Sequence, residues 1–479
     1  MSADFRVLPA GASADSFPEK SAMITVGIIS LGCPKNQSDS EVIIGNILNA
    51  GMQLTADPRE ADVVVVNTCS FILDARRESL DAVAQMRKEA ARKSRKKPLK
   101  IIVAGCMPQR YREQVCEMIP GVDTFVGTDE LEHVAALIKK VVGGSATMPS
   151  GEKIVRVTKR PCYIPDATTP RARLTLPHVA TVKIAEGCNH GCAFCAIPAI
   201  RGRHRSRPLA DVVAEVETLV RKNGVKEINL IAQDTTYYGM DTWKNSRVGR
   251  KTKVDSEHGD SLATLLRAID KIRGDFWVRI QYTHPAHWSD ELIKVFATSP
   301  HVAKYVDIPL QHISDKMLAT MSRETDGKYI RGLLAKIRTG IPNVAIRTSL
   351  IVGFPGETEE DFAELLEFLK TERFDRAGVF RYSREEGTPS ATMPAQCSER
   401  VKTERWNKSM SLLQKISKEI QREKLGKKIR VLVDEPGIAR TEGDAIEIDG
   451  VVYVPKNLPV GEFADVVVTG FKAYDLIAR

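Results

Sequence analysis

Three closely spaced cysteines constrain this chain more than any other feature of its sequence. They have C-x3-C-x2-C spacing and follow an apolar, strand-like run at 179–185, in the stretch Gly187-Cys188-Asn189-His190-Gly191-Cys192-Ala193-Phe194-Cys195. Thiolates are the soft ligands that hold iron–sulfur clusters, and a loop this short can direct three of them at one cluster. Three ligands leave one iron of a four-iron cluster open to a substrate. The spacing therefore predicts a cluster that takes part in catalysis and does not only store electrons. The alternatives are a three-ligand zinc site with a distant fourth ligand, or a chance spacing.

The spacing, with the aromatic Phe194 in its last gap, resembles the signature of the radical S-adenosylmethionine (SAM) enzymes. The resemblance implies a [4Fe-4S] cluster held by Cys188, Cys192 and Cys195, with SAM chelating the fourth iron. One electron from the cluster would cleave SAM to a 5′-deoxyadenosyl radical, which abstracts hydrogen from an unactivated carbon. The protein itself would supply positioning and the exclusion of water.

Length and composition indicate a multidomain globular protein. A chain of 479 residues is too long to fold around one compact core, so we expect two to four domains. No apolar run approaches the roughly 20 residues of a membrane span, and the N-terminus lacks the basic-then-apolar order of a secretory signal. Nine cysteines spread thinly over the chain argue against a secreted disulfide framework. We therefore expect a cytoplasmic protein without a membrane partner.

After an expected flexible tail at 1–22, alternating strands and helices predict a parallel α/β (flavodoxin-like) domain at 23–140. The expected strands are 23–30, 62–66 and 99–104, and the expected helices begin near Ser38 and span 73–96. Loops at the carboxyl ends of parallel strands gather along one edge. A second three-thiolate site is therefore predicted there, from the cysteines that follow the three strands: Cys33, Cys69 and Cys106.

The alternative for these three cysteines is that they are buried, apolar-like side chains. The three remaining cysteines outside both sets have no comparable placement, and we expect them to be structural: Cys116, Cys162 and Cys397.

A connector at 141–175, rich in Gly, Ser, Thr and Pro, leads to renewed alternation over 176–397. Its expected strands favour a partial (β/α)6 barrel and lie at 179–185, 227–232, 276–281, 305–308, 345–352 and 376–382. The loops at the carboxyl ends of barrel strands carry active sites. They offer the candidate SAM-binding residues Phe194, Gln233, Asp234, Gln311, Gly353, Gly356 and Glu357. The catalytic residue that orients the substrate cannot be assigned, and the candidates are His284 and His312.

Two further segments complete the expected architecture. A charged linking helix is predicted at 398–426, and short strands with turns over 427–479 predict a small OB-like β-barrel that resembles the TRAM domain. Residues 240–260 are polar, and we expect them to form an exposed insertion.

The order of these parts resembles the radical SAM methylthiotransferase family. The resemblance covers nearly everything after residue 22. It implies a second [4Fe-4S] cluster on Cys33, Cys69 and Cys106 that carries or sacrifices sulfur. One SAM would donate a methyl group to that sulfur, and a second SAM would supply the radical that activates the substrate carbon.

Several stretches resemble the ribosomal-protein (RimO-type) branch of that family, namely Ser30-Leu31-Gly32-Cys33-Pro34-Lys35-Asn36, 307–312 and 380–388. That branch methylthiolates the β-carbon of an aspartate in small-subunit ribosomal protein twelve. The segment 443–450 also resembles it, with Ile446 where proline is common. The alternatives are methylthio transfer to a modified adenosine of tRNA, and a non-catalytic iron–sulfur binding or sensor protein.

Charge favours a protein substrate over RNA. The chain carries a net +9, with local basic stretches at 87–100 and 244–253, whereas residues 427–479 carry seven Lys or Arg and nine Asp or Glu, a net −2. An RNA-binding barrel is expected to be basic, while an acidic one suits a basic ribosomal protein, here through Glu442, Asp444, Glu447 and Asp449. We therefore expect a monomer that acts on a ribosomal protein, free or on the assembling ribosome, with an electron donor and without tRNA.

Overall fold

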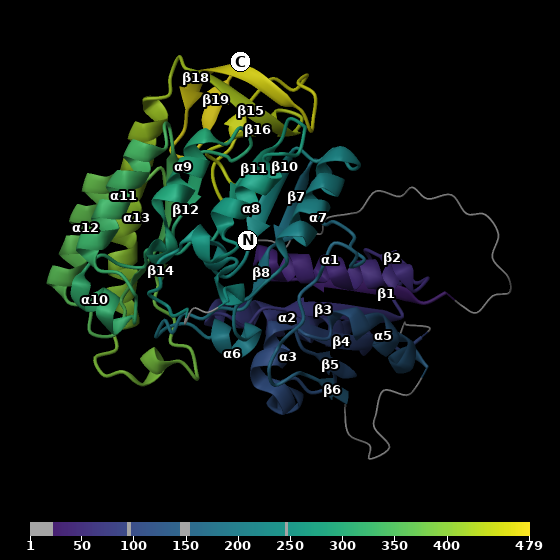
Figure 1. Ribbon diagram of the computed structural model, residues 1–479. Coiled ribbons are helices and arrows are strands. Elements are labelled where there is room, and N and C mark those ends of the chain that lie inside the picture. The colour runs from purple at the N-terminus through teal and green to yellow at the C-terminus, as the bar shows by residue number, and fades with distance from the viewer. Residues whose placement is uncertain (1–22, 93–96, 144–153, 245–247) are drawn as a thin grey trace. The chain divides into compact units, whose positions relative to one another are not determined.

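The computed structural model describes residues 23–92, 97–143, 154–244 and 248–479 (Figure 1). The tail expected at 1–22 lies outside them. The chain forms two compact units, which we call the N-terminal unit (Met1–Leu174 with Ala199–Gly202) and the C-terminal unit (Thr175–Pro198 with Arg203–Arg479). Within the described ranges, no helix is both long enough and apolar enough to span a membrane.

The N-terminal unit contains a six-stranded parallel sheet. Its strands are β1 (Thr25–Ser30), β2 (Gln53–Thr55), β3 (Val63–Thr68), β4 (Lys100–Gly105), β5 (Thr124–Val126) and β6 (Ile154–Arg156). Their order β2-β1-β3-β4-β5-β6 contains the flavodoxin-like order, so the predicted fold class is confirmed. Strand β6 pairs with β5, although the sequence indicated only a connector at that position.

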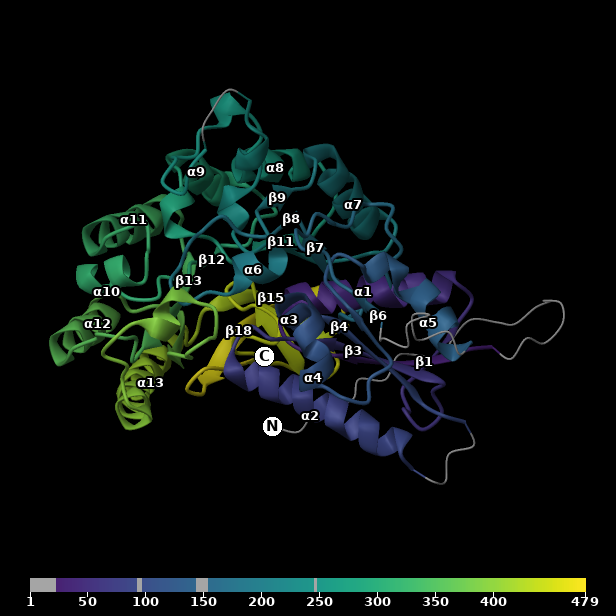
Figure 2. The ribbon, with the colours of Figure 1, turned by 90° about the horizontal axis from the view of Figure 1, so that it is seen from below.

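Helices cover both faces of this sheet, as Figure 2 shows. One face carries α1 (Pro34–Asn49) and α5 (Val134–Val142), and the other carries α2 (Leu73–Ala90), α3 (Cys106–Tyr111) and α4 (Val115–Met118). Alternate strand residues explain both cores, because Val63 and Val65 pack on the α1 side while Val64 and Val66 pack on the α2 side.

Helix α1 begins one turn earlier than predicted. Cys33 has extended backbone angles (φ −87°, ψ 168°), and Pro34 occupies the first turn, where its missing N–H costs nothing. The earlier start places Asn36 and Asp39 on the helix, where both side chains are buried. Helix α2 ends at Ala90, and the predicted end at 96 lies outside the described ranges.

The C-terminal unit contains six parallel strands that form two sheets, β7-β10-β11 and β12-β13-β14. The strands are β7 (Val179–Lys183), β10 (Glu227–Ile231), β11 (Trp277–Ile280), β12 (Tyr305–Asp307), β13 (Ala345–Val352) and β14 (Arg376–Arg381). Helices follow them along the outer side (Figure 1): α7 (Leu209–Arg221), α8 (Leu262–Ile269), α9 (Asp290–Thr298), α10 (Asp315–Thr320), α11 (Gly327–Gly340) and α12 (Glu359–Glu372). The predicted partial barrel is confirmed.

A closed five-stranded barrel follows the long helix α13 (Glu399–Arg422). Its strands are β15 (Lys428–Glu435), β16 (Ile438–Thr441), β17 (Val452–Tyr453), β18 (Phe463–Phe471) and β19 (Leu476–Ala478). Alternating valines such as Val431, Val433 and Val466 fill its core. The predicted small β-barrel is confirmed.

The acids of this small barrel serve a purpose that the sequence did not indicate. Asp444 forms a buried ion pair with Arg376 of β14, and Asp449 accepts a hydrogen bond of 2.7 Å from the Tyr305 hydroxyl. Both carboxylates therefore contact residues of the partial barrel formed by β7 and β10–β14, in the same unit. The expectation that Asp444 and Asp449 attract a basic ligand is therefore wrong, because net charge does not reveal which acids are already paired.

A buried ion network joins the small barrel to the strands of the larger one. Arg440 lies 2.7 Å from Glu227 and 2.6 Å from Asp434, and Glu227 also pairs with Arg279 at 2.9 Å. His178 completes the network at 3.0 Å from Asp434. Separating the two barrels would leave these charges buried without their partners, which is energetically costly. The network therefore stabilises the contact between the small barrel and the larger one.

Candidate functional site

The cysteines of the N-terminal unit lie at the carboxyl ends of three neighbouring strands. Cys33 follows β1, Cys69 follows β3 and Cys106 follows β4, and β3 pairs with both other strands. Gly32 adopts a φ of +91°, and a β-carbon there would lie 2.7 Å from that of Cys69. Glycine at this position thus permits the close approach of two cysteine-bearing loops.

Polar side chains contact the Cys106 thiol of this triad. Asn36 Nδ2 donates to the Leu31 carbonyl at 2.6 Å, and its Oδ1 lies 3.9 Å from Cys106 Sγ. Arg201 pairs with Asp39 at 2.7 Å and donates from Nη2 to Cys106 Sγ at 3.3 Å. Burial raises the pKa of the Cys106 thiol to about 12, although Arg201 opposes the rise. A thiolate here needs compensating positive charge, which a bound iron–sulfur cluster provides.

The cysteines of the C-terminal unit lie between two short antiparallel strands, β8 (Ala185–Glu186) and β9 (Arg205–Ser206). We call Gly187–Cys195 the cluster loop. It is followed by the short helix α6 (Ile197–Arg201). The His190 amide lies 3.5 Å from Cys188 Sγ, and Arg323 Nη1 donates to Cys192 Sγ at 3.3 Å. The three thiols are half-buried and form no disulfide, and they are a donor set that fits a three-thiolate [4Fe-4S] cluster.

Behind the cluster loop lies a buried group of histidines and carboxylates. His190 donates or accepts at both ring nitrogens, 2.8 Å from Asp234 and 3.0 Å from Glu324. Burial opposes protonation, but these two carboxylates raise the pKa of His190 to about 9. His284 stacks on His190 at a centroid distance of 3.9 Å, and burial lowers its pKa. The network fixes the ring next to Cys188.

The same group offers candidate metal ligands. The ligand atoms of His190, Asp234, His284 and His287 all lie within 4.8 Å of one another. However, Asp234 Oδ2 is only 2.8 Å from His190 and 2.9 Å from His287. Two ligands of one tetrahedral zinc ion, each about 2.1 Å from it, stand about 3.4 Å apart. The observed distances are those of hydrogen bonds, so we interpret the group as a hydrogen-bonded scaffold.

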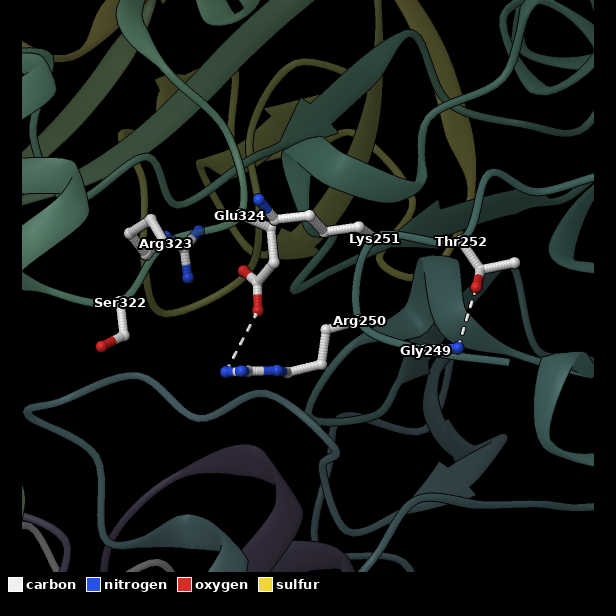
Figure 3. Close-up of a pocket in the computed structure, with 7 residues that line it drawn as sticks. All are labelled: Gly249, Arg250, Lys251, Thr252, Ser322, Arg323 and Glu324. Atoms are coloured by element: carbon white, nitrogen blue, oxygen red, sulfur yellow. Dashed lines mark hydrogen bonds and ion pairs between the residues drawn. The ribbon is translucent and has the colours of Figure 1, made fainter. Parts of the chain in front are cut away.

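A pocket of about 590 Å³ borders the cluster loop (Figure 3). Gly249–Thr252 and Ser322–Glu324 line it, so that three basic side chains face one acid. Figure 3 shows Glu324 pointing towards Arg250, at 3.9 Å. A β-carbon at Gly191 would lie 2.6 Å from Arg250, which places the pocket against the cluster loop. Its net positive charge suits an anionic ligand.

Buried polar atoms without partners lie at this pocket. Within the described part of the chain, Arg323 Nε, Glu324 Oε2 and His284 Nε2 have no aligned hydrogen-bond partner. His284 Nε2 and Glu324 Oε2 are 3.4 Å apart. Buried polar groups in proteins are nearly always satisfied, so these three atoms mark a place where a polar ligand fits.

The insertion expected at 240–260 is exposed only in part. Met240 and Trp243 are buried and pack with Tyr237, and they anchor the segment that carries Arg250 to the pocket. The polar composition hid these two anchors, and Arg250 was visible only as one member of the basic stretch 244–253. Arg201, Arg323, Asn36 and Asp39 were missed as well, because their roles arise from contacts distant in sequence.

The structure divides the predicted SAM-binding residues into two groups. Gln233 Oε1 has no partner among the described residues, and a β-carbon at Gly356 would have nothing within 4 Å, so both positions can still accept a ligand. Gln311 has a φ of +74°, an uncommon conformation for a residue other than glycine. Phe194 packs in a cluster that includes Met321 and Phe354. Asp234 is committed to its two histidines and to Thr236.

Three predicted residues take part in packing instead. A β-carbon at Gly353 would lie 2.3 Å from Lys402 Cγ, so this glycine accommodates α13. Glu357 bonds Arg405 at 2.6 Å and His312 Nε2 at 3.1 Å, while His312 Nδ1 accepts from the Ser314 amide. Both nitrogens of His312 are therefore engaged, which leaves His284 as the better placed of the two candidate histidines.

Models of three protein families match successive parts of this chain. Uncharacterized protein family UPF0004 matches residues 25–127, the radical SAM superfamily matches 182–369, and the TRAM domain matches 425–479.

Curated relatives match over nearly the whole chain, and each is a ribosomal protein uS12 methylthiotransferase RimO. The relative from Akkermansia muciniphila is 54% identical, with 95% of this chain and 100% of the relative covered. The relative from Opitutus terrae is 53% identical, with 95% and 96% covered. The relative from Geobacter sulfurreducens is 42% identical, with 95% and 98% covered.

Two solved structures of the radical SAM methyltransferase TsrM from Kitasatospora setae share the fold. One, with tryptophan and a SAM analogue bound, has a TM-score of 0.54 at 13% identity, and covers 83% of this chain and 89% of its own. The other, with cobalamin and a [4Fe-4S] cluster, has a TM-score of 0.53 at 14% identity, and covers 77% and 73%.

Proposed function

This chain belongs to the RimO family of radical SAM methylthiotransferases, and we propose that it adds a methylthio group to ribosomal protein uS12. The β-carbon of an aspartate of uS12 is the proposed acceptor, with the methylthio group replacing one hydrogen. The observation that carries the proposal is a pair of three-thiol sites in a chain that matches the RimO relatives over 95% of its length. One site lies at the carboxyl ends of the parallel strands β1, β3 and β4, and the other lies in the single loop between β8 and β9.

The cofactors of this family are SAM and [4Fe-4S] clusters. We assign the SAM-binding cluster to Cys188, Cys192 and Cys195, and an auxiliary cluster to Cys33, Cys69 and Cys106. When bound, these groups supply one-electron cleavage of SAM, hydrogen abstraction from carbon, and sulfur. The chain's own residues hold them: the hydrogen-bonded His190 fixes the cluster loop, while Gln233, Gln311 and Gly356 border the proposed SAM site.

The positive pocket beside the cluster loop is the proposed site for the carboxylate of the substrate aspartate. Arg250 and Lys251 supply charge from one side, and Arg323 supplies it from the other. His284, buried and uncharged, lies beside the pocket acid Glu324 and is the proposed orienting group. Such an arrangement would fix the β-carbon relative to the reacting centre, which is the main contribution a protein makes to radical chemistry.

Arg250→Gln is expected to raise the KM for uS12 by roughly tenfold, because one charge-assisted hydrogen bond contributes about 1.5 kcal/mol or more. SAM cleavage without substrate should not change. The matched control is Lys253→Gln, which removes the same charge from an exposed position on the same segment. Steady-state kinetics with purified uS12 measure both variants. An equal KM for the two variants would move the carboxylate site elsewhere.

The partners follow from the proposed substrate. We propose a monomer that receives electrons from a separate donor and works in the cytoplasm, where ribosomal proteins are assembled. Transfer RNA is not expected to be a substrate.

The test is mass spectrometry of small-subunit proteins and of tRNA nucleosides from cells with and without the gene. We expect uS12 to lose one methylthio group in the deletion strain, while the tRNA nucleosides stay the same. A deletion strain with intact uS12 and altered methylthio-adenosine would assign the enzyme to tRNA.

A further inference from the structure

Among the residues that the structure describes, each cysteine triad receives a hydrogen bond from an arginine to one of its sulfurs. Arg201 Nη2 lies 3.3 Å from Cys106 Sγ, and Arg323 Nη1 lies 3.3 Å from Cys192 Sγ. Both contacts are within the range for hydrogen bonds to sulfur. The two arginines come from different parts of the chain and belong to different units.

Several contacts hold the Arg201 side chain next to Cys106 Sγ. Its side chain is 3% exposed, its Nη1 lies 2.7 Å from Asp39 Oδ2, and its Nη2 also approaches Asn36 Oδ1 at 3.4 Å. Asp39 is 2% exposed and lies on α1, which starts directly after Cys33. The guanidinium is therefore fixed between a buried carboxylate and a buried thiol. Movement of the side chain would break the hydrogen bond to one or both of these groups.

Arg323 is fixed by the backbone. Its Nη2 donates to the Pro309 carbonyl at 3.1 Å, and its amide donates to the Leu318 carbonyl at 2.9 Å. The preceding Ser322 has a φ of +58°, an uncommon conformation for a residue other than glycine. The turn that carries Arg323 is thus specified by several contacts, as expected for a side chain with a positional role.

We propose that Arg201 and Arg323 are positioning residues that each raise the reduction potential of one cluster, the auxiliary cluster and the SAM-binding cluster respectively. Reduction adds negative charge to a cluster, and hydrogen bonds to its sulfurs and a nearby buried cation stabilise that charge. Each triad has its own arginine, so the two potentials are set separately. The inference rests on the proposed assignment of one cluster to each triad.

Two single-cluster proteins separate the effects. A full-length Cys188→Ala/Cys192→Ala/Cys195→Ala variant keeps the auxiliary site, and a Cys33→Ala/Cys69→Ala/Cys106→Ala variant keeps the SAM site. Iron content of these two proteins tests the cluster assignment independently of the arginines. In each, Arg201→Met and Arg323→Met are then compared by redox titration monitored by electron paramagnetic resonance.

Arg201→Met is expected to lower the potential of the auxiliary cluster by enough to change its reduced-to-oxidised ratio about tenfold, about 59 mV for one electron. It should leave the SAM-binding cluster unchanged. Arg323→Met should show the reverse pattern. Arg201→Lys, which keeps the charge but loses the planar fork, should shift the potential in the same direction by less.

A control replaces Arg171, which forms a buried ion pair with Glu41 of α1 at 2.5 Å in the same unit as Arg201. Arg171→Met should lower thermal stability without moving the auxiliary potential. Equal potentials in the Arg201 variants and the wild type would overturn the proposal, as would a shift in the potential of the SAM-binding cluster in those variants. Loss of the cluster from both Arg201 variants, with the fold intact, would show a structural role instead.

Discussion

Replacing Cys33, Cys69 and Cys106 together by alanine is expected to abolish methylthio transfer completely while SAM cleavage continues. The three thiols belong to the N-terminal unit, and the cysteines assigned to SAM chemistry belong to the C-terminal unit. Loss of the proposed auxiliary cluster removes the sulfur source but leaves the cluster loop intact. Iron and sulfide contents of the anaerobically reconstituted protein should fall to about half, and deoxyadenosine release should persist.

The chain supplies its own control for this experiment. The remaining three cysteines, Cys116, Cys162 and Cys397, form no disulfide and lie in neither triad. Their triple alanine variant should keep the full iron content and the full transfer activity. If the first variant lost SAM cleavage as well, with its fold intact by circular dichroism, the two sites could not have the separate roles proposed above.

Arg440→Met is expected to destabilise the C-terminal unit by about 3 kcal/mol, because it leaves Glu227 and Asp434 buried with fewer compensating charges. The apparent melting temperature and the protease resistance of the small β-barrel both measure this loss. Lys428→Met is the control, since its ion pair with Asp465 is exposed and should contribute less than 1 kcal/mol. Equal melting temperatures for the two variants would contradict the network's role.

The pH dependence of the stability of Arg440→Met tests the direction of this electrostatic effect. Burial would raise the pKa of Glu227, but Arg279 and Arg440 hold it below its ordinary value. In the wild type, ionised Glu227 contributes to the free energy of unfolding at pH values above the ordinary carboxyl pKa, near 4. This contribution is lost as the pH falls through the lower pKa that Glu227 has in the folded protein. In Arg440→Met the folded pKa rises, so protonation relieves the buried charge. The stability difference between variant and wild type should therefore shrink as pH falls from 7 towards 4.

The alternation of strands and helices predicted the three-part architecture well, because the period and length of each apolar run depend on local sequence. All six strands of the larger barrel occur within two residues of their expected ends. The placement of Cys33, Cys69 and Cys106 after neighbouring strands followed from topology alone. Helix α1 starts earlier than expected because Pro34 fits the first turn of a helix, where its missing N–H costs nothing.

Contacts between distant residues could not be predicted in the same way. Asp444 and Asp449 looked like surface acids, and only the packing of two barrels shows that Arg376 and Tyr305 engage them. His312 and Glu357 had the composition of a ligand site, yet they bind each other. Arg201 follows the cluster loop in sequence but reaches Cys106, a pairing that no local pattern contains.

The most direct test of the proposed function uses purified, reconstituted enzyme with SAM, a reductant and purified uS12, in parallel with tRNA. Tandem mass spectrometry with methyl-deuterated SAM locates the product. We predict one labelled methylthio group on the β-carbon of a single aspartate of uS12, and no labelled nucleoside in tRNA. A labelled methylthio-adenosine with unmodified uS12, from enzyme that cleaves SAM, would contradict the assignment.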